Sequence, residues 1–258
     1  MPIRTDRTGQ AFVITLDRPE AMNSIDSGMF DQLGAAWDEF EHDDALRVAI
    51  VTGAGDRAFC AGRDLVKSSA DSQNDWSRRR ETAGAPRLTP EGIWKPIIAA
   101  INGHCLAAGL ALALGCDVRI ASPNATFGTM AAKRGIVAGG GQTQRLARYV
   151  PFGVAMEMIL FAERISAQRA YEVGLVNRLV EQPALMDAAL EWAAMLCANG
   201  PLAMSAMKQA AYEGGWDMPF REGMRLEARL YSEILDTEDA AEGPRAFAEK
   251  RAPNFKGR

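Results

Sequence analysis

Residues 95–122 hold the sequence feature that most restricts the fold. Two short apolar runs, KPIIAAING and CDVRIAS, each have the composition of a fully buried strand. Between them, the Asn102–Gly103 turn leads into LAAGLALALG, which predicts a helix with very small side chains. The order strand, helix, strand is typical of an α/β protein. A helix built from such small residues also allows another group to come close to its backbone.

The same alternation occurs earlier in the chain. Ala11–Pro19 has β-branched and aromatic character, which predicts a strand, and Ser27–Phe40 has apolar residues at helical spacing. Arg47–Gly55 predicts another buried strand that ends in a glycine turn, and Ala58–Leu65 predicts a short strand followed by a loop. These segments extend the predicted α/β core.

The C-terminal half changes character after the three glycines at positions 139–141. Helical patterns follow, with Ser166 as a predicted helix N-cap and Gly174 as a predicted helix stop. Ala184–Ala252 contains long amphipathic stretches and no convincing strand. The sequence therefore predicts an α/β core with a helical region at its C-terminal end.

Composition excludes several classes of protein. The 258 residues carry a formal net charge of −4, and the longest basic block is the short Arg78–Arg80 run, so we expect no nucleic-acid partner. No apolar run approaches the roughly 18 residues of a membrane span, and the N-terminus lacks a signal-peptide pattern, so we expect a cytoplasmic protein without a membrane partner. The four cysteines and two histidines show no ligand spacing, which predicts no metal site and no structural disulfide.

Several motifs together carry a family resemblance. They are AFCAGRDL, INGHCLAAGLALALGCDVRIAS, TFGTMAAKRGI, GGGQTQRL and ERISAQRAYEVGLVNRLV. In combination they resemble the crotonase superfamily, whose best-known member is enoyl-CoA hydratase, and the resemblance runs from LDRPEAMNS to AFAEKRAPNFK. It implies an α/β fold with a spiral of β-β-α units, and C-terminal helices that cover a neighbouring subunit in a homotrimer or a dimer of trimers.

The resemblance also implies an oxyanion hole for an acyl-CoA thioester. By motif position, its two donors are the backbone N–H groups of Arg63, after Ala61 and Gly62, and of Ala108, within LAAG. A thioester enolate carries negative charge on oxygen, and backbone donors at a helix N-terminus stabilise such charge. Small side chains around these donors let the substrate reach the backbone.

The acids of the hydratases are expected at two positions, and neither is acidic here. One lies three residues after the helix donor, on the same helix face, where this chain has Ala111. The other belongs to a Pro-Glu pair, where this chain has Met130 and Ala131. A branch that resembles naphthoate synthases uses an aspartate slightly later, and this chain has Ala138 there. The resemblance thus implies an oxyanion hole without its usual acid–base pair.

Other side chains in the motifs have two readings each. Asp64 and His104 are candidates for acid–base chemistry, although a structural hydrogen bond is favoured for Asp64 and a core or subunit contact for His104. Cys60 and Cys105 flank the two oxyanion loops, and packing is favoured over nucleophilic reactivity because no activating group is apparent.

Basic side chains in these motifs are candidates for contacting the substrate. Arg63, Lys133 and Arg134 are candidates for binding an acidic acyl group, and the sequence does not choose among them. The resemblance also implies a CoA phosphate ligand where this chain has Glu20, for which Arg18 or Lys67 would have to compensate. Near the C-terminus, residues of the FAEKR segment match a stretch that reaches the CoA nucleotide in the family: Phe247, Lys250 and Arg251.

The resemblance assigns the following residues to substrate binding: Glu20, Ala21, Met22, Ala61, Gly62, Asp64, Leu65, Leu106, Ala111, Met130, Ala131, Arg134, Phe247 and Lys250. It implies a crotonase core at 1–196 and a trimerisation region at 197–258, with no cofactor beyond the CoA of the substrate. The expected function is that of an acyl-CoA enzyme that stabilises a thioester enolate, with isomerase, lyase or hydrolase chemistry rather than efficient simple hydration. The alternative is a noncatalytic acyl-CoA-binding or assembly subunit that kept the fold.

Overall fold

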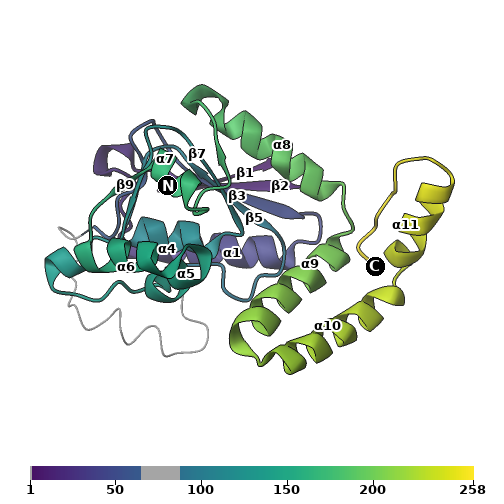
Figure 1. The fold of residues 1–258 in the computed structure, drawn as a ribbon. Coiled ribbons are helices and arrows are strands. Elements are labelled where there is room, and N and C mark those ends of the chain that lie inside the picture. The colour runs from purple at the N-terminus through teal and green to yellow at the C-terminus, as the bar shows by residue number, and fades with distance from the viewer. Residues whose placement is uncertain (1, 65–87) are drawn as a thin grey trace.

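The computed structural model describes residues 2–64 and 88–258, and these form two β-sheets with helices around them (Figure 1). The first sheet has six strands in the order β1 (Ile3–Thr8), β2 (Ala11–Leu16), β3 (Val48–Gly53), β5 (Ile97–Ile101), β7 (Val118–Ala121) and β10 (Arg178–Leu179). The second sheet has the order β4 (Ala58–Cys60), β6 (His104–Leu106), β8 (Thr126–Gly128) and β9 (Ile165–Ser166). The pairs β1–β2 and β8–β9 are antiparallel, and the other pairs are parallel.

The helices are α1 (Ser27–His42), α4 (Ala108–Gly115), α5 (Gln142–Tyr149), α6 (Phe152–Met156), α7 (Ala167–Glu172), α8 (Leu185–Cys197), α9 (Pro201–Gln209), α10 (Phe220–Leu235) and α11 (Glu238–Ala248). A π-helical stretch, η5 (Ala210–Asp217), joins α9 to α10. The α/β class and the helical C-terminal region predicted from the sequence are confirmed.

The central strands of the first sheet are buried on both faces, which explains their continuous apolar runs. On one face α8 packs through Leu185 and Ala189 against the strands. On the other face lies the larger core, which α1 enters with Trp37 and Phe40, both at 0% exposure. Because α4 contributes Leu110 and Leu112–Leu114 to this same core, its apolar composition serves burial as well as close backbone approach.

Capping at the ends of helices agrees with the predicted signals. The Ser166 side chain accepts a hydrogen bond from the Arg169 N–H, so it is the N-cap of α7. Gly174 follows the end of that helix with φ +80°, a left-handed conformation that favours glycine. Both predictions are confirmed.

One element differs from the prediction around the Asn102–Gly103 turn. His104–Leu106 does not belong to the helix that follows but forms the strand β6, and α4 begins only at Ala108. A three-residue strand has no measurable hydrophobic period, and β6 exists because it pairs with β4 and β8. The predicted boundary between residues 196 and 197 falls within the last turn of α8, and the division into core and trimerisation region stays a prediction.

Candidate active site

Two loops of the second sheet meet where their strands end. The strands β4 and β6 are parallel neighbours with Cys60 opposite Cys105, so the segments that follow them leave from the same edge. Gly62 has φ +117°, and a Cβ atom built on it would lie 3.0 Å from the Ala107 Cβ and 3.8 Å from the Ala108 nitrogen. The loop before Arg63 is therefore in contact with the start of α4, as the oxyanion prediction requires.

Close packing also explains the small residues of α4. A Cβ atom on Gly109 would lie 2.2 Å from the Cys60 carbonyl oxygen, a distance that no side chain tolerates. The second residue of the helix must therefore be glycine for α4 to rest directly on the end of β4. Glycine lowers the intrinsic stability of a helix, so its presence here is explained by this close packing and not by helix propensity.

The backbone at the first turn of α4 presents donors. Ala107 has φ 48° and ψ −116°, a conformation that L residues rarely adopt, and its N–H donates to the Gly128 carbonyl at 2.9 Å. The first backbone bond into the helix runs from the Ala111 N–H to the Ala107 carbonyl at 3.0 Å. The Ala108 N–H precedes this bond, so it belongs to the N-terminal donors of the helix that have no partner within it. These donors and the aligned peptide dipoles favour a negative charge at this end.

A third segment holds the loop at residues 61–64 in place. The Ala61 N–H donates to the Met22 carbonyl at 3.0 Å, and the Ile25 N–H donates to the Gly62 carbonyl at 2.8 Å. The Asp64 N–H then donates to the Ile25 carbonyl at 3.0 Å. Four of the predicted substrate-binding residues, Met22, Ala61, Gly62 and Asp64, are thus brought together by backbone bonds between distant parts of the chain.

The Asp64 carboxylate is engaged in an ion pair. Arg18 lies 3.0 Å from Asp64 through Nη2 and 3.1 Å from Asp26 through Nη1, and its side chain is only 12% exposed. These contacts support the structural reading of Asp64. The Arg18 guanidinium already binds carboxylates and also lies near the exposed Glu20. It is therefore not free to bind a CoA phosphate in place of the expected ligand. Lys67, the other candidate, lies outside the described residues.

The positions expected for acids in the hydratases and in the related branch are buried. Ala111 is 1% exposed, and Ala131 and Ala138 are each 7% exposed. Met130 has φ 59° and follows β8, whose Gly128 pairs with Leu106 at the start of the α4 loop. Ala111 thus lies in the first turn of α4 and Met130 lies two residues after Gly128, while Leu65 lies outside the described residues.

His104 makes a structural contact. Its Nδ1 lies 2.8 Å from the Thr126 hydroxyl oxygen, on the neighbouring strand β8. Partial burial, and then the positive charge of Arg164, lower the pKa of His104. The bond to a hydroxyl on the neighbouring strand is what supports the core reading of His104.

The two cysteines that flank the site, and Cys116 at the far end of α4, are buried thiols. Cys60, Cys105 and Cys116 are all 0% exposed. Burial raises the pKa of Cys60 and of Cys116 to about 12, and it raises the pKa of Cys105 well above its usual value. A nucleophilic cysteine needs a lowered pKa, so these thiols pack rather than react.

The three basic candidates have different surroundings. Lys133 forms an ion pair with Glu163, while the Arg134 Nη1 donates to the Met130 carbonyl at 2.9 Å and leaves the side chain exposed. Both belong to a single 3-10 turn, η2 (Ala132–Arg134), which directly follows the buried Ala131. Arg63 is also exposed, on the loop that meets α4.

The predicted CoA residues of the C-terminal segment are not brought to the two loops. Phe247 is 86% exposed on α11, and Lys250 follows that helix with φ 54°. Figure 1 shows α11 on the far side of α9 and α10 from α4. Arg251 is committed to Glu242 at 2.5 Å. Within this single chain, then, the C-terminal segment and the loops form separate regions.

Sequence reasoning missed two buried carboxamides that shape these loops. The Asn23 side chain donates to the carbonyls of Ala54 at 3.0 Å and Ala58 at 2.7 Å. The Asn102 side chain donates to the Gly53 carbonyl at 2.8 Å and accepts from its N–H at 3.2 Å. Asn102 was visible only as half of an asparagine–glycine turn, and a turn signal does not reveal a bond to another strand.

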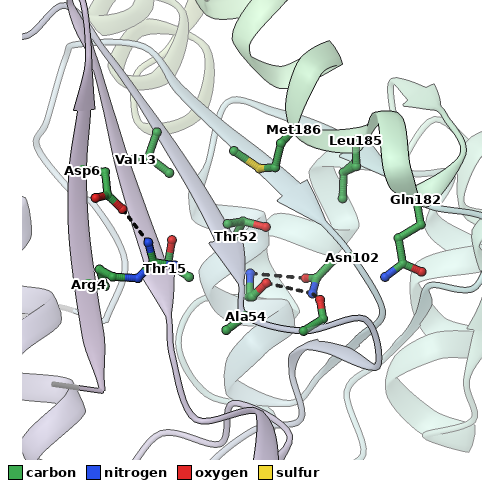
Figure 2. Close-up of a pocket in the computed structure, with 12 residues that line it drawn as sticks. Arg4, Asp6, Val13, Thr15, Thr52, Ala54, Asn102, Gln182, Leu185 and Met186 are labelled. Carbon is green, nitrogen blue, oxygen red and sulfur yellow. Dashed lines mark hydrogen bonds and ion pairs between the residues drawn. The ribbon is translucent and has the colours of Figure 1, made fainter.

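Asn102 also borders a cleft of about 370 Å³ between strands β1, β2 and β3 of the first sheet and the start of α8. Figure 2 shows its polar side, with the ion pair between Arg4 and Asp6 at 2.8 Å, and the start of α8 at Leu185. None of the predicted site residues lines this cleft. The chemistry of the two loops is therefore separate from it.

Within residues 2–64 and 88–258, no group of three His, Cys, Asp or Glu side chains is arranged to hold a metal ion. Over the same residues, no helix has the length and apolar character needed to cross a membrane.

The chain is similar to known proteins over nearly its full length. Residues 6–258 match the family described as Enoyl-CoA hydratase/isomerase. The (E)-benzylidenesuccinyl-CoA hydratase of Thauera aromatica is 43% identical over 257 residues, which cover 100% of both chains. The carnitinyl-CoA dehydratase of Salmonella typhi is 41% identical over 98% of this chain and 97% of its own.

A solved structure gives the same result for the fold. The crystal structure of an enoyl-CoA hydratase from Bacillus anthracis superposes with a TM-score of 0.92 and 36% identity over 100% of both chains. The predicted crotonase fold is confirmed. By the match of its whole sequence and of its fold, this chain belongs to the enoyl-CoA hydratase/isomerase family of acyl-CoA enzymes, within the crotonase superfamily.

Proposed function

We propose that this protein binds an acyl-CoA thioester and stabilises the enolate of its acyl group with the backbone N–H groups of Arg63 and Ala108. The observation that carries this proposal is the contact of Gly62 with the start of α4, where the two loops meet. The glycine and alanine residues there leave the backbone donors accessible to a carbonyl oxygen. One such donor contributes about 3 to 4 kcal/mol in other enzymes.

The relatives favour addition or loss of water as the reaction class. Two of them are named a hydratase and a dehydratase, and both names describe substituted acyl groups rather than simple fatty acyl chains. In hydration, a water oxygen bonds to the β-carbon and a proton is added at the α-carbon. Ala111 and Ala131 offer neither acid nor base, so we propose that simple enoyl-CoA thioesters are poor substrates.

A charged acyl group supplies the missing chemistry in this proposal. A benzylidenesuccinyl thioester, as the name of the Thauera relative describes it, keeps a second carboxylate on the acyl group. A carboxylate of this kind takes one proton from the attacking water and, once protonated, delivers it to the α-carbon; the exposed guanidinium of Arg134 or Arg63 is a partner that positions it. We therefore propose an acyl-CoA that carries a carboxylate near its reacting carbons.

The oxyanion hole is tested by removing one donor. Ala108→Pro removes the N–H at the first position of α4 and strains Ala107, so binding of an enolate-analogue CoA ester should weaken by roughly 100-fold or more. Glu238→Pro is the matched control, because it places proline at the first position of α11 and should leave that binding unchanged. A folded Ala108→Pro variant with unchanged affinity would contradict the proposal.

A second measurement does not depend on the folding of any variant. The vibrational frequency of a ¹³C-labelled thioester carbonyl should fall when the acyl-CoA binds to the wild-type protein, since the two donors polarise the C=O bond. A frequency equal to that of the free thioester would show that no oxyanion hole forms.

The reaction class is tested with a panel of acyl-CoA thioesters analysed by mass spectrometry. We expect hydrated or dehydrated products from dicarboxylic acyl groups, and kcat/KM below about 10,000 per molar per second on crotonyl-CoA. Replacing both Ala111 and Ala131 by glutamate should raise the crotonyl-CoA rate, because a positioned acid or base contributes about 100- to 10,000-fold. Binding without any product would support the noncatalytic alternative.

A further inference from the structure

Arg119 is a buried cation beneath the far end of α4. It lies on β7 and is 3% exposed. Its guanidinium donates to the carbonyl of Leu175 at 2.6 Å, of Cys116 at 2.8 Å and of Ala113 at 3.3 Å. Every one of these acceptors is a neutral carbonyl oxygen.

In the described part of the chain, the positive charge of Arg119 has no carboxylate in an ion pair with it. None of the ion pairs formed among residues 2–64 and 88–258 includes Arg119. The guanidinium instead lies 4.8 Å from the centre of the Tyr149 ring, and the Tyr149 hydroxyl donates to the Leu114 carbonyl at 3.2 Å. A buried charge without a counterion is costly unless polar groups are oriented to stabilise it.

The C-terminal end of α4 provides that orientation. Ala113 and Leu114 lie in the last turn of the helix, and Cys116 is its C-cap. Helix carbonyls at this end carry partial negative charge, which favours a cation. Arg119 and Tyr149 thus donate to carbonyls at this end of the helix, in addition to the Cys116 N–H, which donates to the Ala113 carbonyl at 3.3 Å.

The opposite end of the same helix bears the proposed oxyanion donor. The helix runs from Ala108 to Gly115, so it is about 12 Å long at 1.5 Å per residue. A charge at that distance in the buried interior is screened far less than at a surface. Its potential has the sign that stabilises negative charge at the thioester oxygen.

We propose that Arg119 is a positioning residue for the reaction: it anchors the C-terminal end of α4 and adds positive potential along the helix at the oxyanion hole. This inference rests on the proposed function, because it needs the thioester oxygen to bind at Ala108. It predicts that Arg119 changes how strongly the thioester C=O bond is polarised, although Arg119 does not contact the thioester.

The test compares neutral and charged replacements in the full-length protein. Arg119→Met removes the charge, and we expect kcat on the best substrate of the acyl-CoA panel to fall about tenfold, the effect of one charge at about 12 Å with an effective dielectric constant of about 20. KM should change by less than about twofold, because binding of CoA is not involved. Arg119→Lys retains the charge and should recover most of kcat.

The vibrational frequency of a bound ¹³C-labelled thioester carbonyl separates this role from a structural one. In Arg119→Met it should move back toward the frequency of the free thioester, while in Arg119→Lys and in the control Tyr149→Phe it should stay near the wild-type value. If the Met variant does not fold, Arg119→Gln gives the same neutral comparison and keeps one donor for the Cys116 carbonyl.

The outcomes distinguish the two proposals. A wild-type frequency shift that is unchanged in the folded neutral variant, with unchanged kcat, would overturn the role of Arg119 alone. Absence of the shift in the wild-type protein would instead overturn the oxyanion hole itself.

Discussion

The start of α4 and the C-terminal arm, residues 201–258, are held in place in opposite ways. At α4 the glycines and alanines remove side chains so that backbone segments touch, as Gly109 shows against Cys60. In the arm, helices α10 and α11 project from the core (Figure 1) and leave large apolar side chains exposed, including Phe220 at 84%. In the first region, the lack of space for side chains fixes how the backbone segments pack. In the second, hydrogen bonds between charged groups hold the helices, and an apolar surface stays exposed.

A few carboxylates organise the arm. The Glu242 side chain lies 2.5 Å from Arg251 and accepts from the Asn254 N–H at 2.9 Å, although Glu242 is only 6% exposed. Asp239 accepts from the N–H groups of Lys256 at 2.6 Å and of Gly257 at 2.8 Å. These two acids fold the C-terminal tail back onto α11.

Polar contacts at α9 and η5 join the arm to the core, and the Arg47 side chain adds a bond to the Phe255 carbonyl at 2.7 Å. Lys208 forms an ion pair with Asp117 at 2.8 Å, and the Tyr212 hydroxyl donates to the same carboxylate at 3.1 Å. The Tyr212 and Tyr149 hydroxyls lie 3.2 Å apart. These contacts between the arm and the core therefore include Tyr149, the residue that also contacts Arg119 beneath α4.

The largest effect should come from adding one methyl group where backbones touch. Gly109→Ala should destabilise the protein by about 3 kcal/mol, the upper end of the usual cost of overpacking, because the new Cβ would lie 2.2 Å from the Cys60 carbonyl oxygen. Gly153→Ala in α6 is the control: its Cβ meets nothing within 4 Å, so it should stabilise by about 0.5 to 1 kcal/mol. Urea unfolding measures both. If both variants changed the free energy of unfolding equally, close backbone packing at Gly109 would not be the cause of its effect.

The buried thiols predict a loss of stability in alkali. Burial raises the pKa of Cys60 and of Cys116 to about 12, whereas an unfolded thiol releases its proton near pH 9. The folded state therefore binds more protons above pH 9, and the stabilisation present below pH 9 is lost as pH rises toward 12. Each of these thiols should lower the free energy of unfolding by about 1.4 kcal/mol per pH unit in that range.

Unfolding measured between pH 8 and pH 10.5 tests this, with Cys60→Ala as the comparison. The variant should lose less stability per pH unit than the wild type, since one thiol no longer titrates. A slope that is unchanged would assign the alkaline loss to other groups.

A smaller and local effect is expected in the arm. Arg251 and then Arg245 lower the pKa of Glu242, so the stability from this group is present above its ordinary value near 4.5 and is lost as pH falls through the lowered value. Glu242→Gln should therefore speed proteolysis and hydrogen exchange of residues 250–258 at neutral pH. The exposed Glu233→Gln, whose partner Arg229 lies 3.8 Å away, should change neither.

The smallest effect on the stability of the single chain should come from the exposed apolar surface. Phe220→Ser should change the free energy of unfolding of the monomer by no more than about 0.5 kcal/mol. We propose that this surface contacts other copies in a homotrimer or a dimer of trimers, which is the assembly in which Phe247 and Lys250 would reach another subunit. Sedimentation should then show an assembly that Phe220→Ser weakens, and a wild-type monomer at micromolar concentration would contradict this proposal.

Much of the fold could be predicted from local patterns. The buried strands β3 and β5 have apolar runs, and α1 has an apolar face at helical spacing, so each was visible without any partner. The strands β6, β8 and β9 have two or three residues each and were not predicted. Strands this short are defined by the pairing of the second sheet, which no local pattern contains.

The sequence by itself determined the small residues at the start of α4, the absence of acids at positions 111 and 131, and the family. Only the tertiary structure decided that Gly62 touches Ala107, that Arg18 binds Asp64, and that Arg119 lies beneath the end of α4. The physical reason is that residue size and helical period are local properties. Contacts between segments tens of residues apart depend instead on how two sheets and a helix pack together, and packing is a property of the whole core.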